Sequence, residues 1–107
     1  MTTPVDVRRL ELHEKLIDIL GSRNVYFQPP SNVQMKYPCI VYQRSTGDTQ
    51  FADNVGYRFT KRYQIILIDK NPDNNDVIQK LTTLPMCTYD RHYTADNLNH
   101  DTFNLYY

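Results

Sequence analysis

The sequence predicts an α+β domain in which a mainly antiparallel sheet with an extended hairpin carries two helices on one face. Two segments space their apolar residues as amphipathic helices do, and five others alternate or cluster them as strands do. These segments follow one another as helix, three strands, helix and two strands. A chain of 107 residues is long enough for one hydrophobic core, so we expect a single domain over residues 1–107.

The first helix is expected to start at a cap formed by Thr3 and Pro4 and to end before Gly21. Between these points apolar side chains recur at helical spacing and predict one buried stripe. Arg8 and Arg9 lie on the other side, where charged side chains usually face solvent. The predicted stripe comprises Leu10, Leu12, His13, Leu16, Ile17, Ile19 and Leu20.

Three strands are expected next. Val25–Phe27 is a short apolar run that Pro29 ends, and Cys39–Tyr42 is a continuous apolar run typical of a strand buried on both faces. Residues 45–54 are polar and predict a loop. Val55–Asp69 alternates apolar and polar residues over a length that exceeds the usual strand. We therefore expect its first half to project from the body as one arm of an extended hairpin.

A second helix and two closing strands complete the chain. Asn71-Pro72-Asp73 predicts the start of the helix and Pro85 its end. Residues 86–89 and 103–107 read as strands, and the polar residues 90–101 between them predict a loop. The apolar stripe of this helix is expected to comprise Val77, Ile78, Leu81 and Leu84.

Composition narrows the classes of function. Twelve basic and twelve acidic residues give a net charge of zero, which counts against a dedicated nucleic-acid binder and favours self-association. The mean hydropathy of −0.62 and the lack of a long apolar run predict no transmembrane span and no membrane partner. The first residues do not resemble a secretory signal, so we expect a protein made in the cytoplasm.

Candidates for catalysis and metal binding are few. Cys39 and Cys87 stand outside any spacing typical of zinc ligands, so we expect both to be reduced and buried. Cys87 and His92 could act as nucleophile and base only with a third group to orient them, which the sequence does not show. The acidic and histidine residues near the C-terminus also lack the spacing of a metal site. We therefore expect no catalytic residues, no metal and no cofactor; the residues weighed as metal ligands are Asp90, His92, Asp96, His100 and Asp101.

Tyrosine is unusually frequent, with nine in the chain beside four phenylalanines and no tryptophan. A tyrosine ring buries a large apolar area while its hydroxyl tolerates water, so tyrosines suit subunit interfaces. Arg58 and Arg62 share one face of the long strand, where they can pair with carboxylates of a partner. The alternatives for this face are the lining of a channel that admits DNA and plain solvent. We therefore predict an interface around the hairpin, made by Thr46, Gly47, Asp48, Phe51, Asp53, Tyr57, Arg58, Phe59 and Arg62.

Four stretches of the sequence carry a family resemblance: Tyr37–Tyr42, Ala52–Asn54, Tyr63–Asp73 and Asp96–Phe103. Through them the chain, from about Leu10 to its last residue, resembles the tail-terminator or tail-completion proteins of long-tailed bacteriophages, also called head–tail joining proteins. The resemblance implies a subunit with a short helix, a curved antiparallel sheet, an extended hairpin and a second helix. It also implies that subunits close into a hexameric ring, which caps the tail tube and docks onto the head connector.

The function implied by this resemblance is structural rather than enzymatic. It places the protein in the neck of the virion as a homo-oligomer, with the tail-tube protein and the head-connector or stopper protein as partners. DNA would pass through the ring without sequence-specific binding. Two alternatives stay open: a head-closure (stopper) protein of the same neck, and a small nucleic-acid-binding accessory domain that uses Arg58, Lys61 and Arg62.

Overall fold

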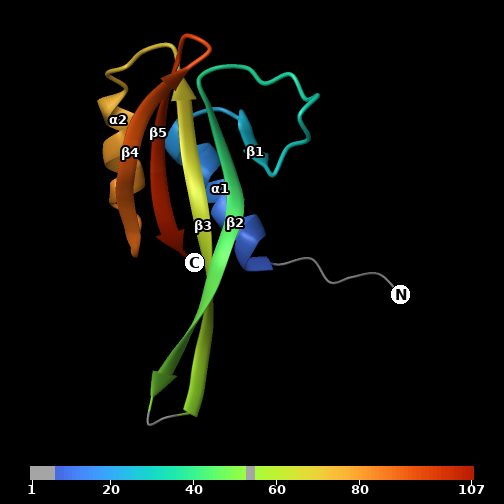
Figure 1. Ribbon diagram of the computed structural model, residues 1–107, viewed down its shortest axis with the longest axis vertical. Helices are drawn as coiled ribbons and strands as arrows, with labels where there is room; N and C mark the ends of the chain where they lie inside the picture. Colours follow the sequence, from blue (N-terminus) through green and yellow to red (C-terminus); the bar gives the residue numbers. More distant parts are fainter. Residues whose placement is uncertain (1–6, 53–54) are drawn as a thin grey trace.

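The structure, a computed structural model, describes residues 7–52 and 55–107, and for residues 46–52 and 55–60 it describes the backbone alone. It confirms the α+β class and the order of helix, three strands, helix and two strands. The elements, shown in Figure 1, are α1 (Val7–Leu20), β1 (Val25–Phe27), β2 (Cys39–Ala52), β3 (Val55–Asp69), α2 (Asn75–Thr82), β4 (Cys87–Ala95) and β5 (Leu98–Tyr106).

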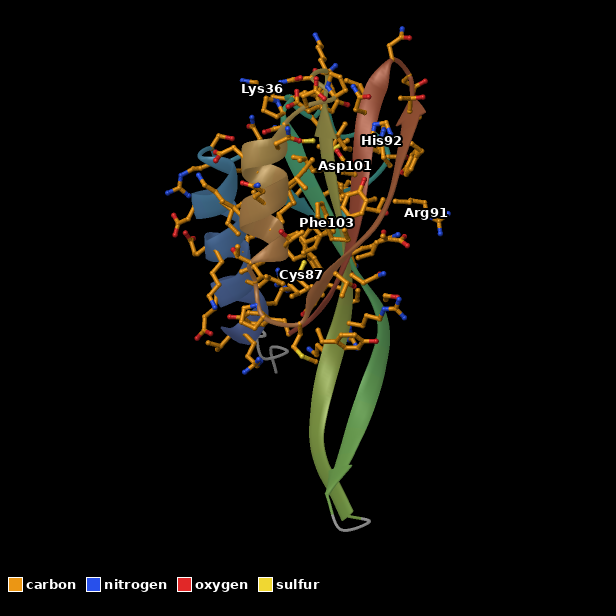
Figure 2. The ribbon with its side chains drawn as sticks, turned by 90° about the vertical axis from the view of Figure 1, so that its left-hand side faces the viewer. Lys36, Cys87, Arg91, His92, Asp101 and Phe103 are labelled. Carbon is orange, nitrogen blue, oxygen red and sulfur yellow. The ribbon has the colours of Figure 1, made fainter. Side chains whose placement is uncertain are left out.

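The five strands form one mixed, mostly antiparallel sheet in the order β1-β2-β3-β5-β4. β1 pairs with β2 in parallel, whereas the other neighbouring pairs are antiparallel. The sheet is open, so β1 and β4 are its two edges. Both helices cover the same face of the sheet, as predicted (Figure 2).

The hydrophobic core lies between the two helices and the face of the sheet that they cover. Leu12 and Leu16 of α1 and Val77 and Leu81 of α2 supply the helical side. Burying a side chain of this size contributes roughly 1.5–3 kcal/mol, so this layer fixes the body from which the rest of the chain extends. The sheet side of the core is formed by Val25, Ile40, Tyr42, Tyr63, Ile65, Leu67, Phe103 and Leu105.

Helix α1 ends as predicted at a glycine. Gly21 has a φ of 81°, and its N–H donates to the carbonyl of Ile17 at 2.9 Å. The buried stripe is narrower than predicted, because Leu10 is 46% exposed. Leu10 stands about 200° around the helix from the fully buried Leu12, so the two cannot share a face. The predicted cap at residues 3–4 lies outside the described residues.

Strand β3 has the predicted bounds, but β2 is longer than predicted. Residues 45–52, expected as part of a loop, continue β2 and pair with β3 until Ala52 lies opposite Val55. Two register shifts interrupt the pairing on the way. A two-stranded ribbon has no core face to fill, so a polar segment without apolar alternation can form it.

Helix α2 begins later than predicted because side chains hold the preceding residues in a turn. The N–H of Asn71 donates to Oδ1 of Asp69 at 3.1 Å, and the N–H of Asp73 donates to Oδ1 of Asn71 at 3.0 Å. The amide of Asn74 donates to the other oxygen of Asp69 at 2.7 Å. Such bonds compete with helical ones, so the helix starts only at Asn75.

The largest correction concerns the C-terminal hairpin. Residues 90–101, expected as a loop, form most of β4 and β5, joined by the two-residue turn Asp96-Asn97. The turn residues have φ of 53° and 62°, the left-handed region that a type I′ turn requires and that Asp and Asn tolerate. Polar residues occupy β4 because it is an edge strand, exposed from Thr88 to Ala95.

Candidate assembly site

The most prominent feature of the molecule is a two-stranded ribbon that extends beyond its body (Figure 1). β3 pairs with β5 from Asp69 only as far as Arg62, and β2 pairs with β1 only through Tyr42. Beyond these points β2 and β3 pair with each other and with no further strand of the described chain. We call this part the distal ribbon and define it as residues 47–52 and 55–61.

The distal ribbon has little to stabilise it by itself. A two-stranded hairpin without a third strand or a helix against one face is marginally stable in water. Over residues 47–52 and 55–60, each arm of the ribbon also has an outer edge of backbone N–H and C=O groups that no strand of the described chain pairs with. A partner strand would satisfy these groups, so the ribbon is suited to binding another chain.

The predicted interface residues fall mainly on this ribbon. The register places Asp48 opposite Thr60 and Phe59 opposite Thr49. Arg62 lies at the root of the ribbon, and Asp53 lies outside the described residues. A contact between these residues and a partner stays a prediction. Along the backbone, Thr46, Gly47, Asp48 and Phe51 belong to β2, whereas Tyr57, Arg58 and Phe59 belong to β3.

The side chain of Arg62 is half-buried at the root of the ribbon. Its guanidinium carbon lies 5.9 Å from the centre of the Tyr106 ring. Its Nε–H is buried, and no hydrogen-bond acceptor within the described residues reaches it. A buried donor left without an acceptor costs roughly 1–3 kcal/mol. The root of the ribbon therefore holds a donor that is closed to solvent and has no acceptor within the described residues.

A pocket of about 230 Å³ opens near the same root, between α1, β5 and the segment before β4. Its basic residues pack on Tyr107: Nε–H of Arg8 donates to the Tyr107 carbonyl at 3.2 Å, and Nζ of Lys15 lies 5.0 Å from the ring centre. The guanidinium carbon of Arg9 lies 4.3 Å from the centre of the Phe27 ring. Arg8 is exposed, as expected of a solvated helix face, and its guanidinium carbon lies 4.8 Å from the centre of the Tyr107 ring. Arg9 is half-buried, which differs from that expectation.

The pairing of Cys87 with His92 does not form a nucleophilic site. Cys87 is half-buried, not buried as expected, and this partial burial raises the pKa of its thiol to about 11, so the thiol is protonated at neutral pH. His92 stands five residues further along β4, roughly 15 Å away at the rise of a strand. Its Nε2 lies 3.1 Å from Oδ1 of Asn99 across the hairpin. Burial likewise raises the pKa of Cys39 to about 11, with a smaller effect from the charge of Asp69.

The residues weighed as metal ligands make separate structural contacts. Asp101 is buried and accepts a hydrogen bond from the Tyr89 hydroxyl at 2.8 Å. The His100 ring stacks on Tyr93 with 4.7 Å between the ring centres, and Asp96 forms the hairpin turn. In the described part of the chain, no three His, Cys, Asp or Glu side chains gather as metal ligands would.

A second candidate surface is the outer edge of β4, which the sequence reasoning missed. β4 has nine residues, and β5 is its one partner strand among the described elements. A bulge at Asp90 shifts the register, after which Arg91–Ala95 pair regularly with β5. Figure 2 shows Arg91 directed away from the helices. The pair Asp96-Asn97 is the signal that could have revealed this strand, because such pairs favour tight hairpin turns.

Comparison with protein-family models and with curated proteins finds no match for this chain. Within residues 7–52 and 55–107, no helix is both long and apolar enough to cross a membrane.

Proposed function

We propose that this protein is a structural protein of a phage virion, whose copies form a ring that caps the tail tube and joins it to the head connector. The observation that carries the proposal is the distal ribbon, a projecting antiparallel hairpin with an open backbone edge on each side. The resemblance of the sequence to tail-terminator and tail-completion proteins supplies the identity of the assembly. That resemblance also implies six copies in the ring.

The physical properties of the chain suit an assembling subunit. Neighbours in a ring contact each other through two different surfaces, and a projecting hairpin can reach from one subunit to the next. The net charge of zero removes long-range repulsion between copies.

Nucleic-acid binding by Arg58, Lys61 and Arg62 fits these observations less well. Such a surface presents its cations to phosphates, whereas Arg62 is half-buried beside Tyr106. A gel shift over a series of salt concentrations is expected to show no steep loss of binding with salt, because few phosphates would be neutralised.

The proposal is tested by deleting the coding sequence from the phage genome that carries it and imaging the particles by electron microscopy. We expect DNA-filled heads without tails, beside tails of irregular and excess length, because the missing ring both ends tube growth and links tail to head. Supplying the wild-type chain in trans should restore joined particles. Heads that lose their DNA beside tails of normal length would assign the chain to head closure, and normal particles would exclude a neck function.

A further inference from the structure

We propose that the distal ribbon of one copy pairs, strand against strand, with the outer edge of β4 of the next copy. The sheet of each subunit then continues into its neighbour. The inference rests on the proposed function, since it names the contact through which the ring would close. Two long backbone edges have no partner strand within the described chain, the outer edge of β4 and the edge of the distal ribbon.

β4 is the receptive edge of the sheet. The opposite edge, β1, has three residues and is soon followed by Pro29 and Pro30, which donate no N–H. β4 has nine residues and contains neither proline nor lysine, the residues that commonly protect strand edges. An exposed edge of this length is a template for an added strand.

The backbone groups that β4 offers can be assigned to residues. The N–H of Arg91 points toward β5, where it donates to Oγ1 of Thr102 at 3.2 Å. Because successive residues of a strand direct their N–H and C=O groups to opposite sides, His92 and Thr94 direct theirs outward. The hairpin turn gives the same assignment. Ala95 and Leu98 flank the two-residue turn as a hydrogen-bonded pair, so Ala95 faces β5 and its neighbour Thr94 faces outward.

The occupant is a second copy, because the ribbon cannot reach β4 of its own molecule. β5 separates β3 from β4 in the sheet, and the ribbon leaves the body at the end opposite the Asp96-Asn97 turn (Figure 1). The lengths also match: Arg91–Ala95 spans roughly 17 Å, and each arm of the ribbon roughly 20 Å. Each copy gives one ribbon and receives one, which is the head-to-tail contact that closes rings.

Of the two arms, β3 is the better donor strand. Its distal residues Val55–Thr60 include a valine, a tyrosine, a phenylalanine and a threonine, all types that favour strands. Its open edge continues the edge that pairs with β5 as far as Arg62 opposite Tyr106. Beyond Arg62 the neighbour's β4 takes the place that β5 holds inside the body.

Two variants of the full chain separate the two halves of the contact. Thr94→Pro removes one outward N–H of β4 and leaves the pairing with β5 intact, and Thr94→Ala is its matched control. In the second variant, Asn-Gly replaces residues 48–60. It keeps Gly47 opposite Lys61, and it keeps the bond from the Tyr107 N–H to the Lys61 carbonyl.

Sedimentation velocity over a concentration series measures self-association, and circular dichroism confirms that each variant is folded. We expect the wild-type chain and Thr94→Ala to associate equally, Thr94→Pro to associate at least about tenfold more weakly, and the short-ribbon variant to stay monomeric. A mixture of Thr94→Pro and the short-ribbon variant should form a dimer of one copy each. The Thr94→Pro copy supplies the ribbon and the short-ribbon copy supplies β4. Neither copy of this dimer can then bind a third subunit.

Three results would overturn the pairing: a folded Thr94→Pro that associates like the wild-type chain, a mixture that forms no dimer, or a wild-type chain that stays monomeric up to millimolar concentration. The first two results would still be compatible with the proposed ring, but its subunits would then contact each other through other surfaces. The neck function itself is judged by the particles of the deletion phage, so the two failures are distinguishable.

Discussion

Nδ1 of His13 lies 2.7 Å from the hydroxyl oxygen of Tyr42, a hydrogen bond that joins α1 to β2 at the core. Tyr42 is fully buried and His13 is half-buried. Burial lowers the pKa of His13; the charge of Glu14 opposes this shift and that of Arg9 adds to it. The imidazole is therefore kept neutral in the folded protein at pH values where a free histidine begins to charge.

We expect the free energy of unfolding to fall as the pH drops below about 6.5. His13 takes up a proton near that pH in the unfolded chain but only at lower pH in the folded one, so the unfolded state binds more protons in this window. At higher pH His13 is neutral in both the folded and the unfolded chain, so it no longer makes the free energy of unfolding depend on pH. Urea unfolding between about pH 7.5 and about pH 5 should show a smaller loss for His13→Gln than for the wild-type chain. An equal loss in both would contradict the role of His13.

Removing the Tyr89 hydroxyl should destabilise the C-terminal hairpin. The buried carboxylate of Asp101 would lose the donor it has at 2.8 Å, so Tyr89→Phe should lower the free energy of unfolding by roughly 1–3 kcal/mol. Partial burial, together with the Asp101 carboxylate, raises the pKa of Tyr89 to about 12, so the bond persists through neutral pH. Tyr93→Phe, which keeps the ring stack on His100, is the control and should change stability by less than about 0.5 kcal/mol. Chemical denaturation that ranks the two variants equally would refute the assignment.

Substitutions of the turn residue Asn97 are expected to change the stability of the protein in opposite directions. At its φ of 62°, glycine is relaxed and a β-branched residue is strained. We expect Asn97→Gly to keep or raise the melting temperature and Asn97→Val to lower the free energy of unfolding by about 1–2 kcal/mol. If thermal unfolding shows Asn97→Val to be as stable as the wild-type chain, the tight hairpin is wrong.

Arg62→Met separates the stability of the subunit from its assembly. Methionine keeps an apolar stem beside Tyr106 and removes the buried Nε donor, so the isolated subunit should be as stable as the wild-type chain or more stable by about 1 kcal/mol. Self-association should weaken, because the charged group that the proposed contact places beside the neighbour's strand is gone. Urea unfolding and sedimentation on the same samples measure both. A loss of stability greater than about 1 kcal/mol would show that Nε is already satisfied within one subunit.

Local patterns predicted much of the fold. The alternation from Val55 to Asp69 predicted β3 with its observed bounds, and the short apolar run Val25–Phe27 predicted β1. The expectations failed where a strand has no buried face. Residues 45–52 and 90–95 are polar because one segment lies in a two-stranded ribbon and the other at a sheet edge, so their pairing is decided by the neighbouring strand rather than by their own periodicity.

The candidate site was predicted in part. The length of β3 predicts a projecting hairpin from the sequence alone, and the ribbon has that form. The β4 edge escaped prediction because edge status depends on strand order, and β5 inserts between β3 and β4. The burial of the Arg62 Nε was not predicted either. The sequence alone places this arginine on a polar strand face exposed to solvent, and its contact with Tyr106 is seen only in the folded chain.

The most direct measurement is made on particles that receive only the shortened chain. Cells infected with the deletion phage are supplied with the variant in which Asn-Gly replaces residues 48–60, and joined heads and tails are counted by electron microscopy beside cells supplied with the wild-type chain. The variant retains both helices and the register at Gly47 and Lys61, so we expect a folded protein, unjoined heads and tails of irregular length. Joined particles of normal tail length, as numerous as those the wild-type chain restores, would contradict the role of the distal ribbon in assembly.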